Sequence, residues 1–343
     1  MHDDAVSVRA GQELDWAALE SHLRDHLELP AEPMDVLQFS GGHANLTYLL
    51  RFGESALVLR RPPFGPIAPG AHDMKREYRV LAQLWRSFPK APRAFLFSDD
   101  ESIIGAPFFV MEQRLGLVIR DQIPASMASH TDAGRRVFLA LVDSMAELHC
   151  VDPAEAGLAD LGKPDGFMAR QVSGWQRRWE LVAPDDPPLA MRDVKERLER
   201  TMPAPVRVSI LHNDLKLDNC QFDPADPDHV TAMFDWDMAT LGDPLADLGT
   251  LLGYSYDTDG QPSGREAAIG IGPRDEAVGR YAAALGIDVE LLDWYEAFAC
   301  WKTAVVLAQL AERQRRAPNG DEDRPDYAER IPALAERALA LVR

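Results

Sequence analysis

The sequence predicts an α+β protein of two lobes, a small β-rich N-lobe followed by a larger, mainly helical C-lobe. A length of 343 residues exceeds what one hydrophobic core usually supports. Strand-like runs separated by glycine turns dominate the chain as far as about residue 115, and helical apolar spacing dominates the remainder. We therefore expect an N-terminal helix within 1–33, an N-lobe over 34–115 and a C-lobe over 116–343.

The N-lobe is predicted from strand and helix patterns that alternate along the chain. The pairs Gly41-Gly42 and Gly53-Glu54 separate its first three strand-like runs. In chain order, the expected elements are a helix over 14–28, strands over 34–39, 45–52 and 56–60, a helix over about 71–87, and strands within 93–100 and 105–113. Such an order forms one compact α+β unit.

Helical periodicity dominates the C-lobe and is interrupted by short strands. The expected helices cover about 132–150, 166–182, 190–201, 274–285, 287–316 and 326–342, and the strands lie around 206–211, 219–222 and 230–235. No internal repeat or low-complexity tract breaks this pattern.

Composition and charge exclude several classes of protein. The chain is 46% hydrophobic and 27% charged, which is typical of a soluble globular enzyme, and its net charge of −19 disfavours nucleic acid and anionic membrane as partners. The first residues lack the pattern of a secretion signal and no long apolar run follows, so we expect a cytoplasmic protein. Three cysteines lie far apart without a CxxC pair, which argues against disulfides or zinc, and we expect them to be buried in a reducing cytosol.

The segment ILHNDLKLDN places many polar groups directly after an apolar stretch. His212-x-Asp214-x4-Asn219, followed by the apolar run VTAMF and then Asp235, has the spacing of a phosphoryl-transfer loop and its metal-binding segment. Transfer of a phosphoryl group needs one carboxylate to accept a hydroxyl proton, and oxygen ligands for Mg²⁺. Asp214 suits the base, and Asn219 and Asp235 suit the metal. The alternative is that these Asp and Asn residues only shape turns.

Neighbouring polar residues receive supporting roles in this interpretation. We expect His212 to orient the loop through a backbone hydrogen bond, and Lys216 either to touch the γ-phosphate or to be solvated. Asp243 and Asp247 are expected to cap the next helix and brace the loop, and whether Asp237 joins the metal site stays open. The aromatic residues are core by default, with Tyr254, Tyr256 and Trp301 as candidates to line an acceptor pocket.

The N-lobe supplies candidates for contacts with the nucleotide phosphates. A turn between the first two strands, Ser40-Gly41-Gly42-His43, would cover the phosphates; Arg60 on the third strand would contact them; and Glu77 on the next helix would hold Arg60. Arg60 could instead be a surface arginine, and Glu77 an exposed acid paired with basic neighbours on its helix. Strand alternation sends Arg61 to the opposite face, where we expect it to be exposed.

The segments FSGGHANLTYLL, LRRPPFGPIAPGAHDMKREYRVLAQL, ILHNDLKLDN and FDWDMATLGDPLADLGTLL together resemble the aminoglycoside phosphotransferase-like family. Within it, they are similar to a bacterial branch related to the kinase-like N-terminal domain of certain acyl-CoA dehydrogenases, over about residues 14–316. The resemblance implies a protein-kinase-like fold with ATP between the lobes, Mg²⁺ at Asn219 and Asp235, and Asp214 as the catalytic aspartate. It also implies that the backbone of the linker, Glu112, Gln113 and Arg114 as far as Leu115, binds the adenine.

Departures from the family pattern limit what the resemblance implies. Arginine stands at position 60 where many members have lysine, and Asn213 replaces the usual glycine. Trp236-Asp237 stands where protein kinases have Phe-Gly, and no activation segment of the protein-kinase type follows, so a folded protein substrate is not expected.

From these residues and this resemblance we expect an ATP- and Mg²⁺-dependent phosphotransferase that acts on a hydroxyl of a small molecule. The branch resemblance favours a hydroxyacyl-CoA or a related hydroxy acid as that substrate. An aminoglycoside O-phosphotransferase and a catalytically silent nucleotide-binding regulatory module are the alternatives. Assembly into a homodimer stays open.

Overall fold

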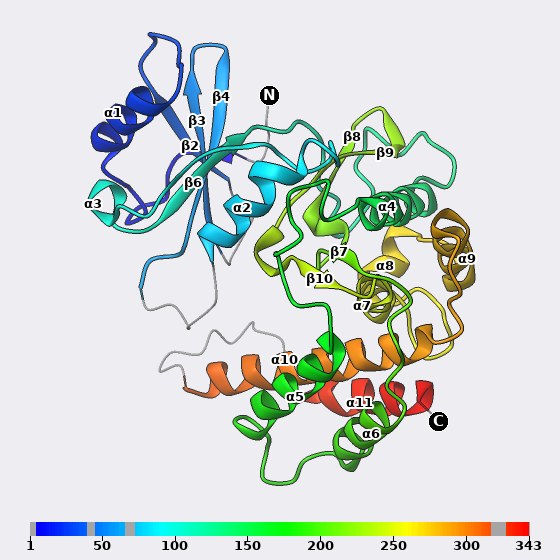
Figure 1. Ribbon diagram of the computed structural model, residues 1–343. Helices are drawn as coiled ribbons and strands as arrows, with labels where there is room; N and C mark the ends of the chain where they lie inside the picture. Colours follow the sequence, from blue (N-terminus) through cyan, green and yellow to red (C-terminus); the bar gives the residue numbers. More distant parts are fainter. Residues whose placement is uncertain (1–4, 40–44, 66–72, 317–326, 343) are drawn as a thin grey trace.

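The computed structural model describes residues 5–39, 45–65, 73–316 and 327–342, and it has the two lobes expected from the sequence (Figure 1). The small lobe is built on a six-stranded antiparallel sheet of order β1-β2-β3-β4-β6-β5. Its strands are β1 (Ala5–Val6), β2 (Asp35–Phe39), β3 (Leu46–Phe52), β4 (Ser55–Arg61), β5 (Ala94–Ser98) and β6 (Phe108–Glu112). Its helices are α1 (Trp16–His26), α2 (Met74–Leu84) and the short α3 (Glu101–Ile104).

Helices cover both faces of the small-lobe sheet. Leu19 and Leu23 of α1 are buried in one apolar cluster with side chains of β3, β4 and β6. Val80 and Leu84 of α2 pack with Leu49 on the opposite side, in the cluster that continues into the large lobe. Because alternate residues of a strand point to opposite faces, a strand covered on both sides is almost wholly apolar. This covering explains why β3 (LTYLLRF) is mostly apolar and why Leu46, Leu49, Leu50 and Phe52 are buried along with Tyr48.

Arg61 contradicts the expectation of an exposed side chain. It points away from Arg60, as alternation requires, but it is only 2% exposed. Its guanidinium donates to the carbonyl oxygens of Pro62 (3.1 Å) and Ile104 (3.2 Å) and lies over the Phe64 ring. The expectation failed because the second face of the sheet is covered by protein and not by solvent.

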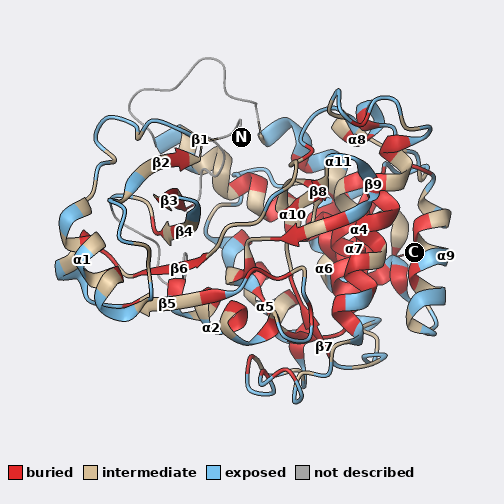
Figure 2. Ribbon diagram, turned by 90° about the horizontal axis from the view of Figure 1, so that it is seen from above, coloured by how far each residue is buried: buried red, intermediate tan, exposed pale blue. Residues whose placement is uncertain are grey.

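The large lobe is mainly helical and holds most of the core. Figure 2 shows that α4 and α7 are among its most deeply buried helices. Its helices are α4 (Ala133–Cys150), α5 (Phe167–Glu180), α6 (Leu189–Arg200), α7 (Leu245–Ser255), α8 (Gly264–Ile269), α9 (Arg274–Leu285), α10 (Leu292–Arg316) and α11 (Ile331–Leu341). The strands form two antiparallel pairs, β7 (Ser209–Leu211) with β10 (Thr240–Gly242), and β8 (Cys220–Asp223) with β9 (Asp226–Met233). The sequence patterns missed β1, α3, α8 and β10, which are too short to show a periodicity. They also gave no range for α7, which the expectation of a helix after Asp243 only implied.

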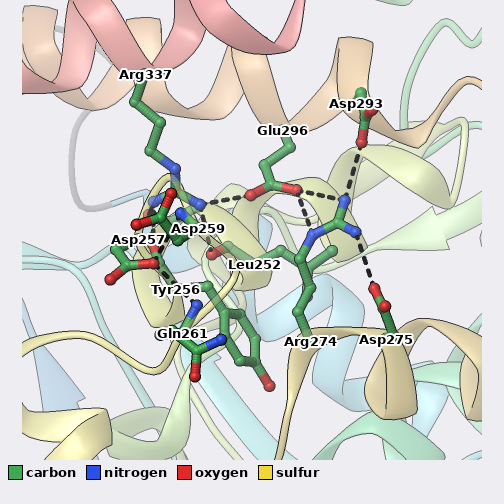
Figure 3. A network of polar contacts seen from close by, with 11 residues as sticks. Leu252, Tyr256, Asp257, Asp259, Gln261, Arg274, Asp275, Asp293, Glu296 and Arg337 are labelled. Atoms are coloured by element: carbon green, nitrogen blue, oxygen red, sulfur yellow. Dashed lines mark hydrogen bonds and ion pairs between the residues drawn. The ribbon is translucent and has the colours of Figure 1, made fainter.

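A buried ionic network joins the C-terminal helices (Figure 3). The Glu296 carboxylate of α10 lies between Arg337 of α11 and Arg274 at the start of α9, with 2.8 Å between Glu296 Oε2 and the Arg274 Nη2 atom. Arg337 also donates to the carbonyl oxygens of Gly253 (3.1 Å) and Tyr256 at the end of α7. Breaking one side of such a buried pair is strongly destabilising, so we expect this network to stabilise the packing of α7, α10 and α11.

Two expectations from composition can be compared with the structure. Among the described helices, none is long and apolar enough to cross a membrane. The three cysteines are free thiols; Cys220 and Cys300 are buried, whereas Cys150 is exposed, contrary to expectation, because it ends α4 at the surface.

Candidate active site

The Asp214 carboxylate lies at the centre of a group of polar side chains after β7. The Lys216 ammonium is 2.8 Å from Asp214 Oδ2, and the Asn219 amide nitrogen is 3.2 Å from the same oxygen. Asn219 also donates to the Asp214 carbonyl at 2.7 Å. Tyr254 of α7 lies near Asp214: burial and the Asp214 charge raise the pKa of its hydroxyl. The structure thus brings together the three loop residues that the sequence places in one motif.

Asp247 of α7 braces the loop, as expected from the sequence. Its buried carboxylate accepts hydrogen bonds from the backbone N–H groups of His212 and Asn213, both at 2.7 Å, and lies 3.2 Å from His149 Nε2. Burial alone would raise the pKa of Asp247, but these hydrogen bonds and the histidines hold it below its usual value. Asn213 has a φ of 67°, in the region that favours glycine, and asparagine is one of the few other residues that tolerates it. The replacement of the family's glycine is therefore compatible with the same loop shape.

His212 and Asp243 have structural roles in this region. The His212 ring lies 2.8 Å, through Nε2, from the carbonyl oxygen of Phe234, which is the backbone contact expected from the sequence. Asp243 accepts from the Leu245 N–H at 2.9 Å at the start of α7, and from the Val206 N–H at 2.6 Å. Neither side chain is free for chemistry, so both support the loop.

Arg60 joins the two lobes through a shared ion pair. Its Nε lies 2.8 Å from Glu77 Oε2, and its Nη2 atom is bonded to Asp235, 175 residues away in the sequence. Arg60 is 12% exposed and Glu77 is 1% exposed, so neither is the surface residue of the alternative interpretation. Asp235 follows β9 with φ 70° and ψ 58°, a left-handed conformation that costs on the order of 1 kcal/mol and often marks functional positions.

Negative charge is in excess around Arg60. Burial raises the pKa of Glu77 to about 7, and the charges of Asp235 and Asp237 act in the same direction, while Arg60 and the Trp236 N–H oppose them. Burial lowers the pKa of Arg60, but the surrounding carboxylates more than reverse this, so it stays charged. Several carboxylates thus share one guanidinium, an arrangement that attracts a further cation.

The residues proposed for Mg²⁺ fit that ion. Asn219 turns its amide nitrogen to Asp214, which leaves its carbonyl oxygen as a ligand, and Asp235 supplies a partly exposed carboxylate. Within the described parts of the chain, no three His, Cys, Asp or Glu side chains are grouped to hold a metal. Mg²⁺ in proteins is commonly held by one or two oxygen ligands together with phosphates, so two suffice.

The linker between the lobes begins where β6 ends. The Glu112 carboxylate accepts from the Arg93 N–H at 2.7 Å and pairs with Arg114 at 2.9 Å, so these two side chains are held by each other. Gly116 approaches the large lobe so closely that a Cβ there would lie 2.5 Å from Thr231 Oγ1. Gln113 lies between these anchors, and the turn Ser40-Gly41-Gly42-His43 lies outside the described residues.

Sequence reasoning missed Lys302 and only partly identified the aromatic residues near the base. Tyr254 lies near enough to Asp214 for the Asp214 charge to raise its pKa. Tyr256 and Trp301 are fully buried and donate to the carbonyl oxygens of Gly272 (3.0 Å) and Met191 (3.1 Å), so they belong to the core. Lys302 is buried on α10, and its ammonium is 3.5 Å from the Asn213 carbonyl. The signal was a single lysine within the apolar run ACWKTAVVLA.

This fold and this group of side chains define a two-lobed phosphotransferase of the kinase-like class. The chain belongs to the phosphotransferase enzyme family, whose family model matches residues 35–280. A solved structure from Ralstonia eutropha, described as a candidate aminoglycoside phosphotransferase, is 28% identical with a TM-score of 0.80, over 96% of this chain and 98% of that one. A thermostable mutant of aminoglycoside phosphotransferase APH(4)-Ia, in ternary complex with AMP-PNP and hygromycin B, has a TM-score of 0.62 at 13% identity over 94% and 98%, and shows the same fold.

Similar sequences occur within longer proteins. Acyl-CoA dehydrogenase family member 11 of Rattus norvegicus is 32% identical over 99% of this chain and 45% of its own length. The Gallus gallus protein of the same name is 31% identical over 97% of this chain and 44% of its own length. The chain therefore spans less than half the length of these relatives. The family resemblance seen in the sequence motifs is confirmed.

Proposed function

We propose that the protein transfers the γ-phosphate of ATP, in the presence of Mg²⁺, to a hydroxyl of a small molecule. The observation that carries this proposal is the Asp214 carboxylate, which contacts Lys216 and Asn219. Farther along the chain, Asp235 is bonded to Arg60. A base, a cation and oxygen ligands gathered in one place are what phosphoryl transfer requires of a protein.

In this proposal, Asp214 accepts the proton of the acceptor hydroxyl. The acceptor oxygen forms its bond to the γ-phosphorus while the bond from that phosphorus to the bridging oxygen of ADP breaks. Lys216, 2.8 Å from the base, is placed to compensate negative charge on the transferred group. Arg60 would contact the other phosphates, held by the buried Glu77. Mg²⁺ bound by Asn219 and Asp235 would neutralise phosphate charge and align the transferred group.

For the acceptor, we propose a hydroxyacyl-CoA or a related hydroxy acid. The support is the likeness of nearly the whole chain to part of proteins named acyl-CoA dehydrogenase family members, at 30–32% identity for family member 11 in Gallus gallus, Rattus norvegicus and Homo sapiens. The solved enzyme in complex with hygromycin B is only 13% identical. An aminoglycoside as acceptor is the second candidate, favoured by the fold alone. A silent regulatory module is disfavoured because it has no need for these polar groups.

The test measures ADP release from ATP and Mg²⁺ with a panel of hydroxylated compounds, and identifies the phosphorylated product by mass spectrometry. The panel holds hydroxy acids, their CoA thioesters and kanamycin, and Asp214→Asn serves as the inactive control. We expect product with the hydroxyacyl compounds and little with kanamycin. Efficient phosphorylation of kanamycin alone would replace the proposed acceptor, and nucleotide binding without any product would favour the regulatory module.

A further inference from the structure

A buried lysine next to the base lacks a carboxylate partner. Lys302 is 9% exposed, and among the described residues its ammonium has one hydrogen-bond acceptor, the Asn213 carbonyl oxygen, at the outer limit of 3.5 Å. An ammonium carries three donors, and burying a charge without a partner is costly. Asn213 directly precedes Asp214 in the chain, so this cation lies beside the base.

A second cation stands close to Lys302, on the neighbouring helix. Arg178 of α5 places its guanidinium 4.4 Å from the centre of the Trp175 ring, and the Lys302 ammonium is 5.7 Å from the centre of the same ring. Arg178 is exposed and, like Lys302, forms no ion pair with any residue that the structure describes. Each positive charge disfavours the other. Burial lowers the pKa of Lys302, and Arg178 and Lys216 act in the same direction; the charges of Asp214 and Asp247 oppose this shift without reversing it.

Two other buried cations of the described chain, Arg61 and Arg337, are better partnered than Lys302: Arg61 donates to two carbonyl oxygens and Arg337 pairs with Glu296. The sequence has 55 acidic against 36 basic residues, and many of its arginines are paired with carboxylates, as Arg274 is with Glu296 and Arg280 with Asp143. A buried ammonium with one distant acceptor among the described residues, and an exposed guanidinium near it, can together bind an anion supplied from outside the chain.

We propose that Lys302 and Arg178, which both lie close to the Trp175 ring, receive an anionic group of the acceptor, so that the preferred acceptor is a hydroxylated anion and not a polycation such as an aminoglycoside. This inference rests on the proposed function and makes its acceptor site specific. The bound anion would relieve the repulsion between the two cations and give Lys302 the hydrogen-bond acceptor that it lacks.

The position of Lys302 limits the shape of the acceptor. Asn213 and Asp214 are consecutive, and consecutive Cα atoms are about 3.8 Å apart, so an anion on Lys302 and a hydroxyl on Asp214 must be close together. A carboxylate a few bonds from the hydroxyl satisfies this. The other source of negative charge is the phosphates of a CoA thioester, which lie much farther from the acyl hydroxyl and could be reached only by the exposed Arg178.

The experiment compares matched charged and neutral acceptors. Medium-chain hydroxy acids that differ in hydroxyl position are each paired with their methyl ester, and the CoA thioester of the same acid is paired with its N-acetylcysteamine thioester. We measure kcat and KM for each compound. A preference for the acid over its ester assigns the anion to a carboxylate, and a preference for the CoA thioester over the neutral thioester assigns it to the CoA phosphates.

Three variants locate the effect. Lys302→Met removes the charge at similar length, and Lys302→Arg keeps a charge. As a control, Arg177→Met removes an exposed charge from α5, the helix that carries Arg178. We expect Lys302→Met to reduce the preference for the charged acceptor over its neutral partner by about ten- to a hundredfold, through KM. Lys302→Arg is expected to retain most of the preference, and Arg177→Met all of it.

The outcomes separate this inference from the proposed function. Wild type that phosphorylates esters or kanamycin as well as acids overturns the inference and leaves the proposed function standing. A fall in kcat for every acceptor, with a lower melting temperature, would show that Lys302 only supports the loop, and would also overturn it. Calorimetry with the same compounds completes the test: acid binding that Lys302→Met abolishes, without phosphate transfer, supports the anion site and refutes the proposed function.

Discussion

Replacing Glu77 by glutamine is expected to change how stability depends on pH. Burial raises the pKa of Glu77 to about 7 from the model-compound value of 4.5. Between these values the folded protein keeps a proton that the unfolded chain releases, so stability falls as pH rises through this window. The contribution is fully present below pH 4.5 and is lost above pH 7. Glu77→Gln removes the titration and therefore this part of the pH dependence.

The magnitude follows from the size of the shift. A difference of about 2.5 pKa units corresponds to about 3 kcal/mol, since one unit is about 1.4 kcal/mol. Glu77 is 1% exposed, so solvent does little to reduce this figure. Loss of the ionic contact with Arg60 adds an offset to the variant at high pH. The quantity to compare is the difference in free energy of unfolding between the two proteins. We ask how this difference changes from pH 4.5 to pH 8.

Urea denaturation supplies the measurement. Wild type, Glu77→Gln and the exposed control Glu101→Gln are unfolded at several pH values from 4.5 to 8.5, in EDTA and without nucleotide. As the pH rises, we expect the free energy of unfolding of Glu77→Gln to increase by about 3 kcal/mol relative to that of wild type. Glu101→Gln should show the same pH dependence as wild type. Parallel curves for wild type and Glu77→Gln would refute the reasoning, because they would show that Arg60 cancels the effect of burial.

Three further predictions concern the base, the metal ligands and the loop brace. Asp214→Asn should lower kcat about a hundredfold or more and leave ATP affinity within a few-fold in calorimetry; near-normal turnover would remove Asp214 from the role of base. Asp235→Asn, in which asparagine tolerates the left-handed backbone, should abolish the tightening of ATP binding by Mg²⁺. Asp237→Asn is its matched control, and an equal loss there would make Asp237 a ligand as well. Asp247→Ala leaves the His212 and Asn213 N–H groups unpaired and should destabilise the fold by about 3 kcal/mol in urea; a change below about 1 kcal/mol would contradict the bracing role.

The loop around Asp214 could be predicted from sequence because its geometry is local. Its base, Lys216 and Asn219 lie within six residues, and the short strands on either side fix where the loop begins and ends. The spacing of these three residues in the sequence is therefore enough to predict most of their arrangement in space. The lobes were predictable for a similar reason, since strand alternation and helical periodicity are properties of short windows.

Contacts between distant segments could not be predicted in the same way. The burial of Arg61 depends on Ile104, 43 residues away, and the contact of Lys302 with the Asn213 carbonyl spans 89 residues. No characteristic spacing in the sequence predicts either of these two contacts. A charged residue is also expected to be exposed when only its sequence is known. Lys302 and Arg61 are buried because other elements of the fold cover them.

Backbone carbonyl oxygens hold the loop before Asp214 against the segment that contains Asp235. His212 contacts the carbonyl oxygen of Phe234 at 2.8 Å, and the Asn213 amide donates to the carbonyl oxygen of Met238 at 2.9 Å. These two contacts lie on either side of Asp235 in the chain, so the residues directly before Asp214 hold the Asp235 segment at both ends. Asn213 and Asp235 both have positive φ values, and strained conformations of this kind persist only where the surroundings fix them. The two hydrogen bonds therefore explain how the segment keeps its left-handed turn, and why a change at His212 should disturb the metal-binding segment as well as the loop.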